Sequence, residues 1–214
     1  MKEKKETKMG EKDSKKFLKI ANTIFAPIYP VIAGQIINNT GIKTGCALDV
    51  GSGPGHLATA LVSVSDLVVY TLDLSPDMIE ICRNRVEETG LSGRVLPTLG
   101  DVSDIPFEDG TFDLVVSRGS WFFWDDLSQG LAEVYRVLKP GGQTYIGGGF
   151  GNAELKKQIV SAMQKQDGGF ESGMKDRIEN MSPERVAAAL ATAKIHDYSI
   201  ISDETGFWLR MVRM

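Results

Sequence analysis

The chain has 214 residues, of which 42% are hydrophobic and 24% charged, and its formal net charge at pH 7 is −4. One globular domain of this length can bury a sizeable core. The acidic balance gives no reason to expect a nucleic-acid partner, because non-specific binding to phosphates draws on an excess of lysine and arginine. No stretch approaches the ~18 apolar residues of a membrane span, so no membrane partner is expected either.

Residues 1–16 differ in composition from the rest of the chain. They hold seven lysines against four acidic residues, and they lack the apolar segment of a secretory signal. We expect a disordered basic leader here, followed by a single domain over residues 17–214.

Cysteine and histidine are scarce. Cys46 and Cys82 lack CxxC spacing, and we expect buried free thiols, which fit a reducing, cytoplasmic location. His56 and His196 lie far apart without ligand-type companions, so we expect no metal site. We expect His56 to be exposed in the first turn of a helix and His196 to lie at a strand edge.

Short apolar runs alternate with helical spacing of apolar residues along the chain. A helical segment over 17–38 is interrupted by prolines, with a kink near 26–30. The remaining predicted elements follow in order: strand 46–50, helix 54–64, strand 67–72, helix 76–89, strands 95–99 and 112–117, helix 126–138, strand 143–147, helices 153–166 and 183–193, and strands 195–202 and 207–212.

This alternation predicts an α/β fold. Helices between strands imply βαβ units, and therefore a Rossmann-like, doubly wound, mostly parallel seven-stranded sheet with helices on both faces. The last two strands have no helix between them, so they must form a C-terminal antiparallel hairpin.

A glycine loop follows the first predicted strand. Gly51 allows a tight turn, and Gly53 lets a ligand approach bare backbone. The strict dinucleotide pattern would place glycine or alanine where this chain has His56. By itself the loop is a weak signal, and its alternative interpretation is a simple tight strand-to-helix turn.

Acidic residues end the next two strands. Asp73 lies 22 residues after Gly51, a distance at which a carboxylate can accept both hydroxyls of a ribose. Its alternative role is helix capping, but Ser75 is the better-placed cap. Asp101 could take the amino group of an adenine with Val102 beneath the ring, or it could be an ordinary turn residue.

Four blocks in register resemble the class I S-adenosylmethionine-dependent methyltransferases, specifically a methyltransferase type 11-like domain. The blocks are ALDVGSGPGHLATAL, TLDLSPDMIEICRNR, GDVSDIPFEDGTFDLVVS and EVYRVLKPGGQTYI. They cover roughly residues 20–150 and are far more specific together than the glycine loop alone. FAPIYP, SRGSWFFW and GGGFGNAEL are similar to small archaeal proteins that carry only a general methyltransferase assignment, which implies an archaeal source.

The resemblance assigns the first loop and its neighbours to the methionine end of S-adenosylmethionine. Asp49 would support the loop and reach the amino group of the cofactor, and Ser117 would present backbone to the methionine end. Tyr29 would fold over the cofactor, the alternative being a core tyrosine. The loop residues against the methionine part would be Gly51, Ser52 and Gly53.

The resemblance also implies the nucleoside contacts. Asp73 would bind the ribose diol, Leu74 and Val102 would sandwich the adenine, and Asp101 would recognise its amino group. Met78, in the following helix, would also line the cofactor site.

The segment after the fourth strand stands where an acceptor should approach. It is not the Asn/Asp-Pro-Pro-aromatic motif of amino-group nucleic-acid methyltransferases. Trp121 or Trp124 would wall an acceptor pocket, unless these rings pack onto the core. Arg118 would bind an acidic acceptor or pair with Asp125 or Asp126.

We therefore predict a methyltransferase that passes a methyl group from S-adenosylmethionine to an unidentified small-molecule acceptor by in-line displacement, leaving S-adenosylhomocysteine. The reactivity resides in the cofactor, so no catalytic residue is assigned. Alternatives are a non-catalytic protein that binds either ligand, and a protein or RNA methyltransferase. A nicotinamide-dependent dehydrogenase is disfavoured by His56. A monomer and a homodimer both remain open.

Overall fold

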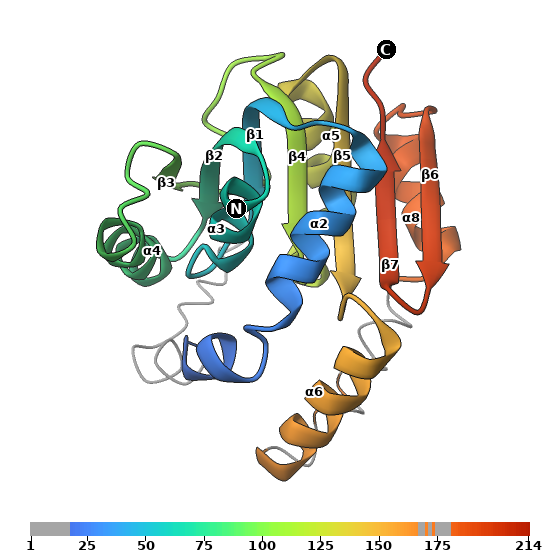
Figure 1. Cartoon of the computed structure of the whole chain (residues 1–214). Coiled ribbons are helices and arrows are strands. Elements are labelled where there is room, and N and C mark those ends of the chain that lie inside the picture. The colour runs from blue at the N-terminus through green and yellow to red at the C-terminus, as the bar shows by residue number, and fades with distance from the viewer. Residues whose placement is uncertain (1–17, 167–169, 171–172, 174–180) are drawn as a thin grey trace, which may run out of the picture.

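The computed structural model describes residues 18–166, 170, 173 and 181–214. The predicted leader at 1–16 lies outside these residues, and the single domain over 17–214 remains a prediction. The named elements, shown in Figure 1, are α2 (Ile28–Thr40), β1 (Thr44–Val50), α3 (His56–Ser63), β2 (Asp66–Asp73), α4 (Pro76–Glu88), β3 (Val95–Leu99), β4 (Phe112–Arg118), the 3₁₀ turn η1 (Trp121–Phe123), α5 (Leu127–Val137), β5 (Leu138–Gly149), α6 (Ala153–Gln166), α8 (Pro183–Thr192), β6 (Tyr198–Asp203) and β7 (Gly206–Met211).

The strands form one seven-stranded sheet in the order β3-β2-β1-β4-β5-β7-β6. β1 to β5 run parallel to one another, whereas β7 runs antiparallel to both β5 and β6. The prediction of a doubly wound, mostly parallel sheet ending in an antiparallel hairpin is confirmed.

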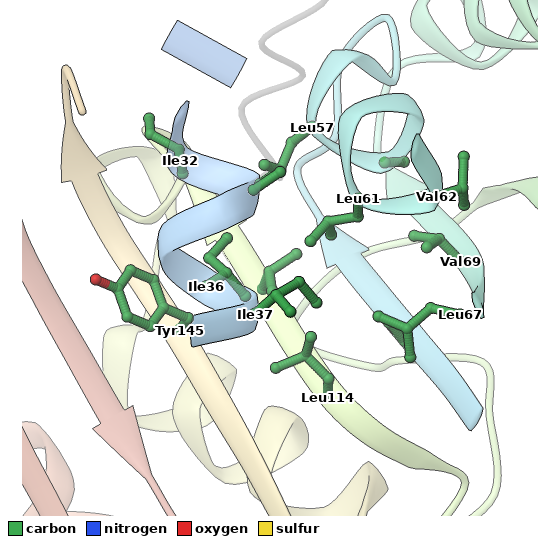
Figure 2. Close-up of a cluster of buried hydrophobic side chains, with 14 of the residues drawn as sticks. Ile32, Ile36, Ile37, Leu57, Leu61, Val62, Leu67, Val69, Leu114 and Tyr145 are labelled. Carbon is green, nitrogen blue, oxygen red and sulfur yellow. The ribbon is translucent and has the colours of Figure 1, made fainter. Parts of the chain in front are cut away.

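Successive side chains of the strands point to opposite faces of the sheet and pack into two hydrophobic cores, one on each face. Ala47, Leu114 and Val116 join the core beneath α2, α3 and α4, part of which Figure 2 shows. Leu48 and Val115 join the core beneath α5 and α8 on the opposite face. The strands at the centre are therefore buried on both sides, which explains their continuous apolar sequences.

Local sequence signals fix most boundaries. The N-terminal helical residues end in a break over 24–27 before α2, at the predicted proline kink. Ser75 caps α4 by accepting a hydrogen bond from the backbone of Met78 at 3.4 Å. Asp126 caps α5 through the backbone of Gln129 at 3.0 Å.

Three details of the prediction are wrong. β5 begins at Leu138 rather than at 143, because Phe112 pairs with Leu138 before a register shift in the ladder. β6 begins at Tyr198 rather than at 195. Cys46 is half-buried, although Cys82 is a buried free thiol as expected.

The segments that flank the carboxyl ends of the parallel strands come from distant parts of the chain. The helical residues 18–23 and α6 both lie beyond this edge of the sheet (Figure 1). Within the part of the chain that the structure describes, no helix is both long and apolar enough to cross a membrane.

Replacing Leu114 by alanine should lower the free energy of unfolding by about 2–5 kcal/mol, because it leaves a cavity at a fully buried position of a central strand. Leu74→Ala is the matched control, since that side chain is 62% exposed and its loss should stay within about 0.5 kcal/mol. Urea unfolding of both variants without ligand measures the difference. Equal losses would contradict the placement of β4 in the core.

Candidate active site

The sheet order places a topological switch point between β1 and β4. The chain passes from β1 outward to β2 and β3, then returns to β4 and continues outward to β5 on the other side. Loops therefore diverge beyond the carboxyl ends of β1 and β4, and ligands of doubly wound sheets bind at this switch point.

The glycine loop after β1 is held against the end of β2. The backbone N–H groups of Gly51 and Ser52 both donate to the carbonyl of Leu72, at 2.7 and 3.1 Å. The N–H of Gly53 donates to Oδ2 of Asp73 at 2.8 Å. Gly51 and Gly53 have φ values of 65° and 52°, which glycine adopts without steric cost.

Gly51 also lies where the loops after β1 and β4 pack against each other. A Cβ atom at Gly51 would overlap the side chain of Ser120. The Ser120 hydroxyl lies 3.0 Å from the carbonyl of Val50 and 2.6 Å from the hydroxyl of Ser117. The β4 loop is thereby fastened to the end of β1.

Asp49 carries a buried carboxylate with one unsatisfied oxygen. The residue is 2% exposed, and Oδ2 has no hydrogen-bond partner among the described residues. Burial, together with the nearby charge of Asp73, raises the pKa of Asp49 to about 8. A cation placed against this oxygen would favour the ionised form.

Asp73 is fixed by the loops on both sides of it. Its Oδ1 accepts from the backbone of Ser75 at 2.9 Å, and its Oδ2 accepts from Gly53. Burial raises the pKa of this half-buried carboxylate. A carboxylate offers about four acceptor positions, so Asp73 can still accept a hydrogen bond from a ribose.

Apolar surface is exposed beside these carboxylates. Leu74 and Leu99, at the ends of β2 and β3, are 62% and 53% exposed. Val102 is half-buried and Met78 is buried. Asp101 accepts a hydrogen bond from the backbone of Ser103 at 2.9 Å. An adenine needs apolar surface against the face of its ring and a carboxylate for its amino group.

The N-terminal segment, residues 18–29, packs over the start of α3. Tyr29 stacks on His56 with ring centroids 4.9 Å apart, and Nε2 of His56 lies 2.7 Å from Oδ1 of Asn22. Arg85 donates to the same oxygen at 3.1 Å. The expectation of an exposed His56 is wrong, because this segment leaves it 5% exposed. Burial and the charge of Arg85 lower its pKa to about 4.

The aromatic residues after β4 separate by burial. Trp121 is 1% exposed and lies near Phe207 in the core, with ring centroids 5.7 Å apart. Trp124 is half-buried and donates from Nε1 to Ser120 at 3.3 Å. Phe123 is 71% exposed. The acceptor-wall roles of Trp121 and Trp124 stay predictions.

Arg118 does not pair with either acid of its own loop. Its Nε and Nη2 donate to the carbonyl of Gly149 at 3.3 and 3.1 Å. Asp126 is used as the cap of α5, and Asp125 is exposed. In the described residues no ion pair joins Arg118 to Asp125 or Asp126, so that alternative is wrong.

Comparison with known proteins agrees with this geometry. Residues 48–146 match the model of a methyltransferase domain. A solved structure from Methanococcus maripaludis, described as a candidate S-adenosyl-L-methionine-dependent methyltransferase, is 42% identical, covers 97% of this chain and 94% of its own, and has a TM-score of 0.94. The chain belongs to the S-adenosylmethionine-dependent methyltransferases.

Curated methyltransferases are similar over shorter stretches. An uncharacterised methyltransferase, YdaC of Bacillus subtilis, is 31% identical over 59% of this chain and 69% of its own length. The ubiquinone/menaquinone biosynthesis C-methyltransferase UbiE of Geotalea daltonii is 36% identical over 48% of this chain. The chain spans 44% of the length of that relative.

The residues present fit the cofactor of this family. S-adenosylmethionine has an ammonium group, a ribose diol and an adenine. The unsatisfied oxygen of Asp49 suits the ammonium group, Asp73 has free acceptor positions for the diol, and exposed Leu74 suits the ring face. In the described residues no group of three or more histidine, cysteine or acidic side chains could hold a metal ion.

Several residues at the site escaped the sequence analysis. Asn22 bonds to both His56 and Arg85, which come from other segments of the chain, so no local pattern could have paired them. Leu99 looked like the end of a strand. Phe25 and Phe150 belong to motifs that the sequence singled out, FAPIYP and GGGFGNAEL, which could have drawn attention to them.

Gly51→Ala should destabilise the protein and prevent ligand binding, because it adds both a strained φ and an overlap with Ser120. Gly90→Ala is the matched control: its φ is 68°, but open space surrounds the added Cβ, so only the conformational cost of about 1–2 kcal/mol applies. Thermal unfolding of both variants measures the difference, and calorimetry reports the binding. Equal destabilisation would show that the loop contact has no energetic weight.

Asp49→Asn should stabilise the ligand-free protein increasingly between about pH 5 and pH 8. The folded chain retains a proton on Asp49 up to about pH 8, whereas the unfolded chain loses it near the ordinary pKa of 3.8. Wild-type stability therefore falls as pH rises through this interval, and asparagine removes that fall. Thermal unfolding midpoints of both proteins across this pH interval test the prediction. A difference between the two midpoints that narrows with rising pH would contradict it.

Asp113→Asn provides a control of opposite sign. Despite its burial, hydrogen bonds from Lys139 and the backbone of Cys46 hold the pKa of Asp113 below its ordinary value. Its contribution to stability is present above the unfolded pKa and is lost as pH falls. This variant should therefore be less stable than wild type at pH 7, with a loss that shrinks in acid.

Proposed function

We propose that this chain transfers the methyl group of S-adenosylmethionine to a small-molecule acceptor. The observation that carries the proposal is the buried, unsatisfied oxygen of Asp49 at the switch point, joined through the glycine loop to the carboxylate of Asp73. We assign these two acids to the two ends of one elongated cofactor.

The bound cofactor would supply a methyl group on a sulfonium, ready for in-line displacement. The chain has to hold that group and align it. Asp49 binds the ammonium end, with Ser117 beside it, while the backbone of Gly51, Ser52 and Gly53 allows close approach. At the nucleoside end, Asp73 accepts the ribose hydroxyls. The adenine contacts are made by Leu74, Met78, Asp101 and Val102.

The N-terminal segment excludes water from the reacting centre. Tyr29 is half-buried and its pKa is raised by burial, so the phenol stays neutral and covers the methionine end. Alignment and exclusion of water are the main contributions that a protein makes to such a displacement. A residue acting as a base is needed only for acceptors that lose a proton.

The proposal of a small-molecule acceptor is supported by relatives such as UbiE, described as a quinone-pathway C-methyltransferase. The acidic composition of the chain agrees with it. We further propose a cytoplasmic location, an archaeal source and a monomeric or homodimeric state. The likeness to the Methanococcus maripaludis protein supports the archaeal source.

Calorimetric titration tests the cofactor site. Wild type should bind S-adenosylmethionine and S-adenosylhomocysteine but not NAD. Asp73→Ala should weaken both by about 10- to 100-fold, since hydrogen bonds to a carboxylate are lost. Asp66→Ala, which removes the same charge from the exposed opposite end of β2, should bind like wild type.

Binding of NAD, or equal effects of the two substitutions, would overturn the assignment of the site. Transfer of labelled methyl groups to a panel of small molecules then separates an enzyme from a non-catalytic binding protein. Labelling of protein or RNA alone would contradict the small-molecule acceptor.

A further inference from the structure

Arg118 has unusual surroundings for a cation at the end of a central strand. Its guanidinium carbon lies 4.9 Å from the ring centre of Phe25, and 5.9 Å from those of Tyr29 and Phe150. These rings come from the N-terminal segment and from the loop after β5. Phe25 and Phe150 are themselves stacked, with centroids 6.3 Å apart. The cation is therefore held in an aromatic enclosure.

This charge has no acidic partner in the described part of the chain. The structure shows ion pairs at Arg136 and Lys139 but none at Arg118. Burial lowers the pKa of Arg118, and only the phenol of Tyr29 acts in the opposite direction. Removing a charge from water without an anion is costly, and cation–π contacts return only part of that cost.

The guanidinium of Arg118 also has N–H donors that its contacts do not use. It has five N–H groups. The contacts to Gly149 and to Tyr29 use at most three of them. At least two donors are therefore left for a ligand, in a group whose planar fork matches a carboxylate.

The position of Arg118 places these donors at the active site. β4 pairs with β1 so that Val116 lies beside Asp49, and Arg118 follows two residues later. The charges of both Asp49 and Arg118 act on the phenol of Tyr29. An unsatisfied acid and a cation without an acidic partner in the described residues thus both act on one tyrosine.

We infer that Arg118 is the anion-binding residue of the active site and that it takes a carboxylate. The carboxylate comes either from the methionine part of the cofactor or from an acidic acceptor with a flat apolar body that packs against the rings. The inference rests on the proposed function. To the proposed function it adds that the active site selects a negatively charged group.

Two binding arms distinguish the sources. The first compares S-adenosylhomocysteine with its decarboxylated analogue, which keeps the ammonium group, on wild type and Arg118→Met. The second titrates benzoate and benzamide into the complexes of both proteins with S-adenosylhomocysteine. Thermal unfolding verifies that Arg118→Met is folded.

If the cofactor supplies the carboxylate, wild type should prefer S-adenosylhomocysteine over the analogue by about 10- to 100-fold, and Arg118→Met should lose this preference. If an acceptor supplies it, Arg118→Met should bind both adenosyl ligands like wild type. Benzoate, but not benzamide, should then bind the wild-type complex alone. Arg118→Lys should restore part of either effect, because it keeps the charge without the fork.

Arg83→Gln is the matched control, since it removes a positive charge from an exposed position of α4 and should change neither arm. Carboxylate selectivity that is absent in wild type, or unchanged in Arg118→Met, would overturn the inference and leave Arg118 a packing residue. Failure of wild type to bind S-adenosylhomocysteine at all would instead overturn the proposed function.

Discussion

The parallel pairing of β1 with β4 is the constraint on which the site depends. Ala47, Leu48 and Asp49 lie beside Leu114, Val115 and Val116 in the middle of the sheet. The strands are neighbours in space, but β2 and β3 separate them in the chain. Their connections must leave in opposite directions. The site lies at this switch point, where the loop of Gly51 still packs against that of Ser120.

Two charged groups around this switch point lack the partners that would offset the free-energy cost of their burial. Asp49 is buried with a free oxygen and a raised pKa, and Arg118 is enclosed by rings without an acid in the described residues. Neither arrangement favours folding by itself. Both become favourable when a ligand supplies the opposite charge, and such perturbed groups in a crevice are typical of binding sites. The polar groups at the site are therefore placed for a ligand at the expense of the free protein.

The N-terminal segment joins the two halves of the site. It meets α3 and α4 through Asn22, and it meets the end of β4 through the ring of Phe25. Tyr29 lies between them, against His56. A segment that precedes the sheet in sequence thus covers its carboxyl edge. Its contacts involve α3, α4 and the end of β4, so it holds these elements together at the site.

The sequence by itself determined the fold class and predicted a set of cofactor residues. Short apolar strands, the cap at Ser75 and the glycine loop are local signals, because each depends on neighbours within a few positions. The spacing from Gly51 to Asp73 identified a pair of residues that the structure joins through Gly53. Tertiary structure alone decided the burial of His56, the partners of Arg118 and the separation of Trp121 from Phe123. Each of these depends on contacts with segments more than 20 residues away or on which face of the loop meets the core, and no period in the sequence records that.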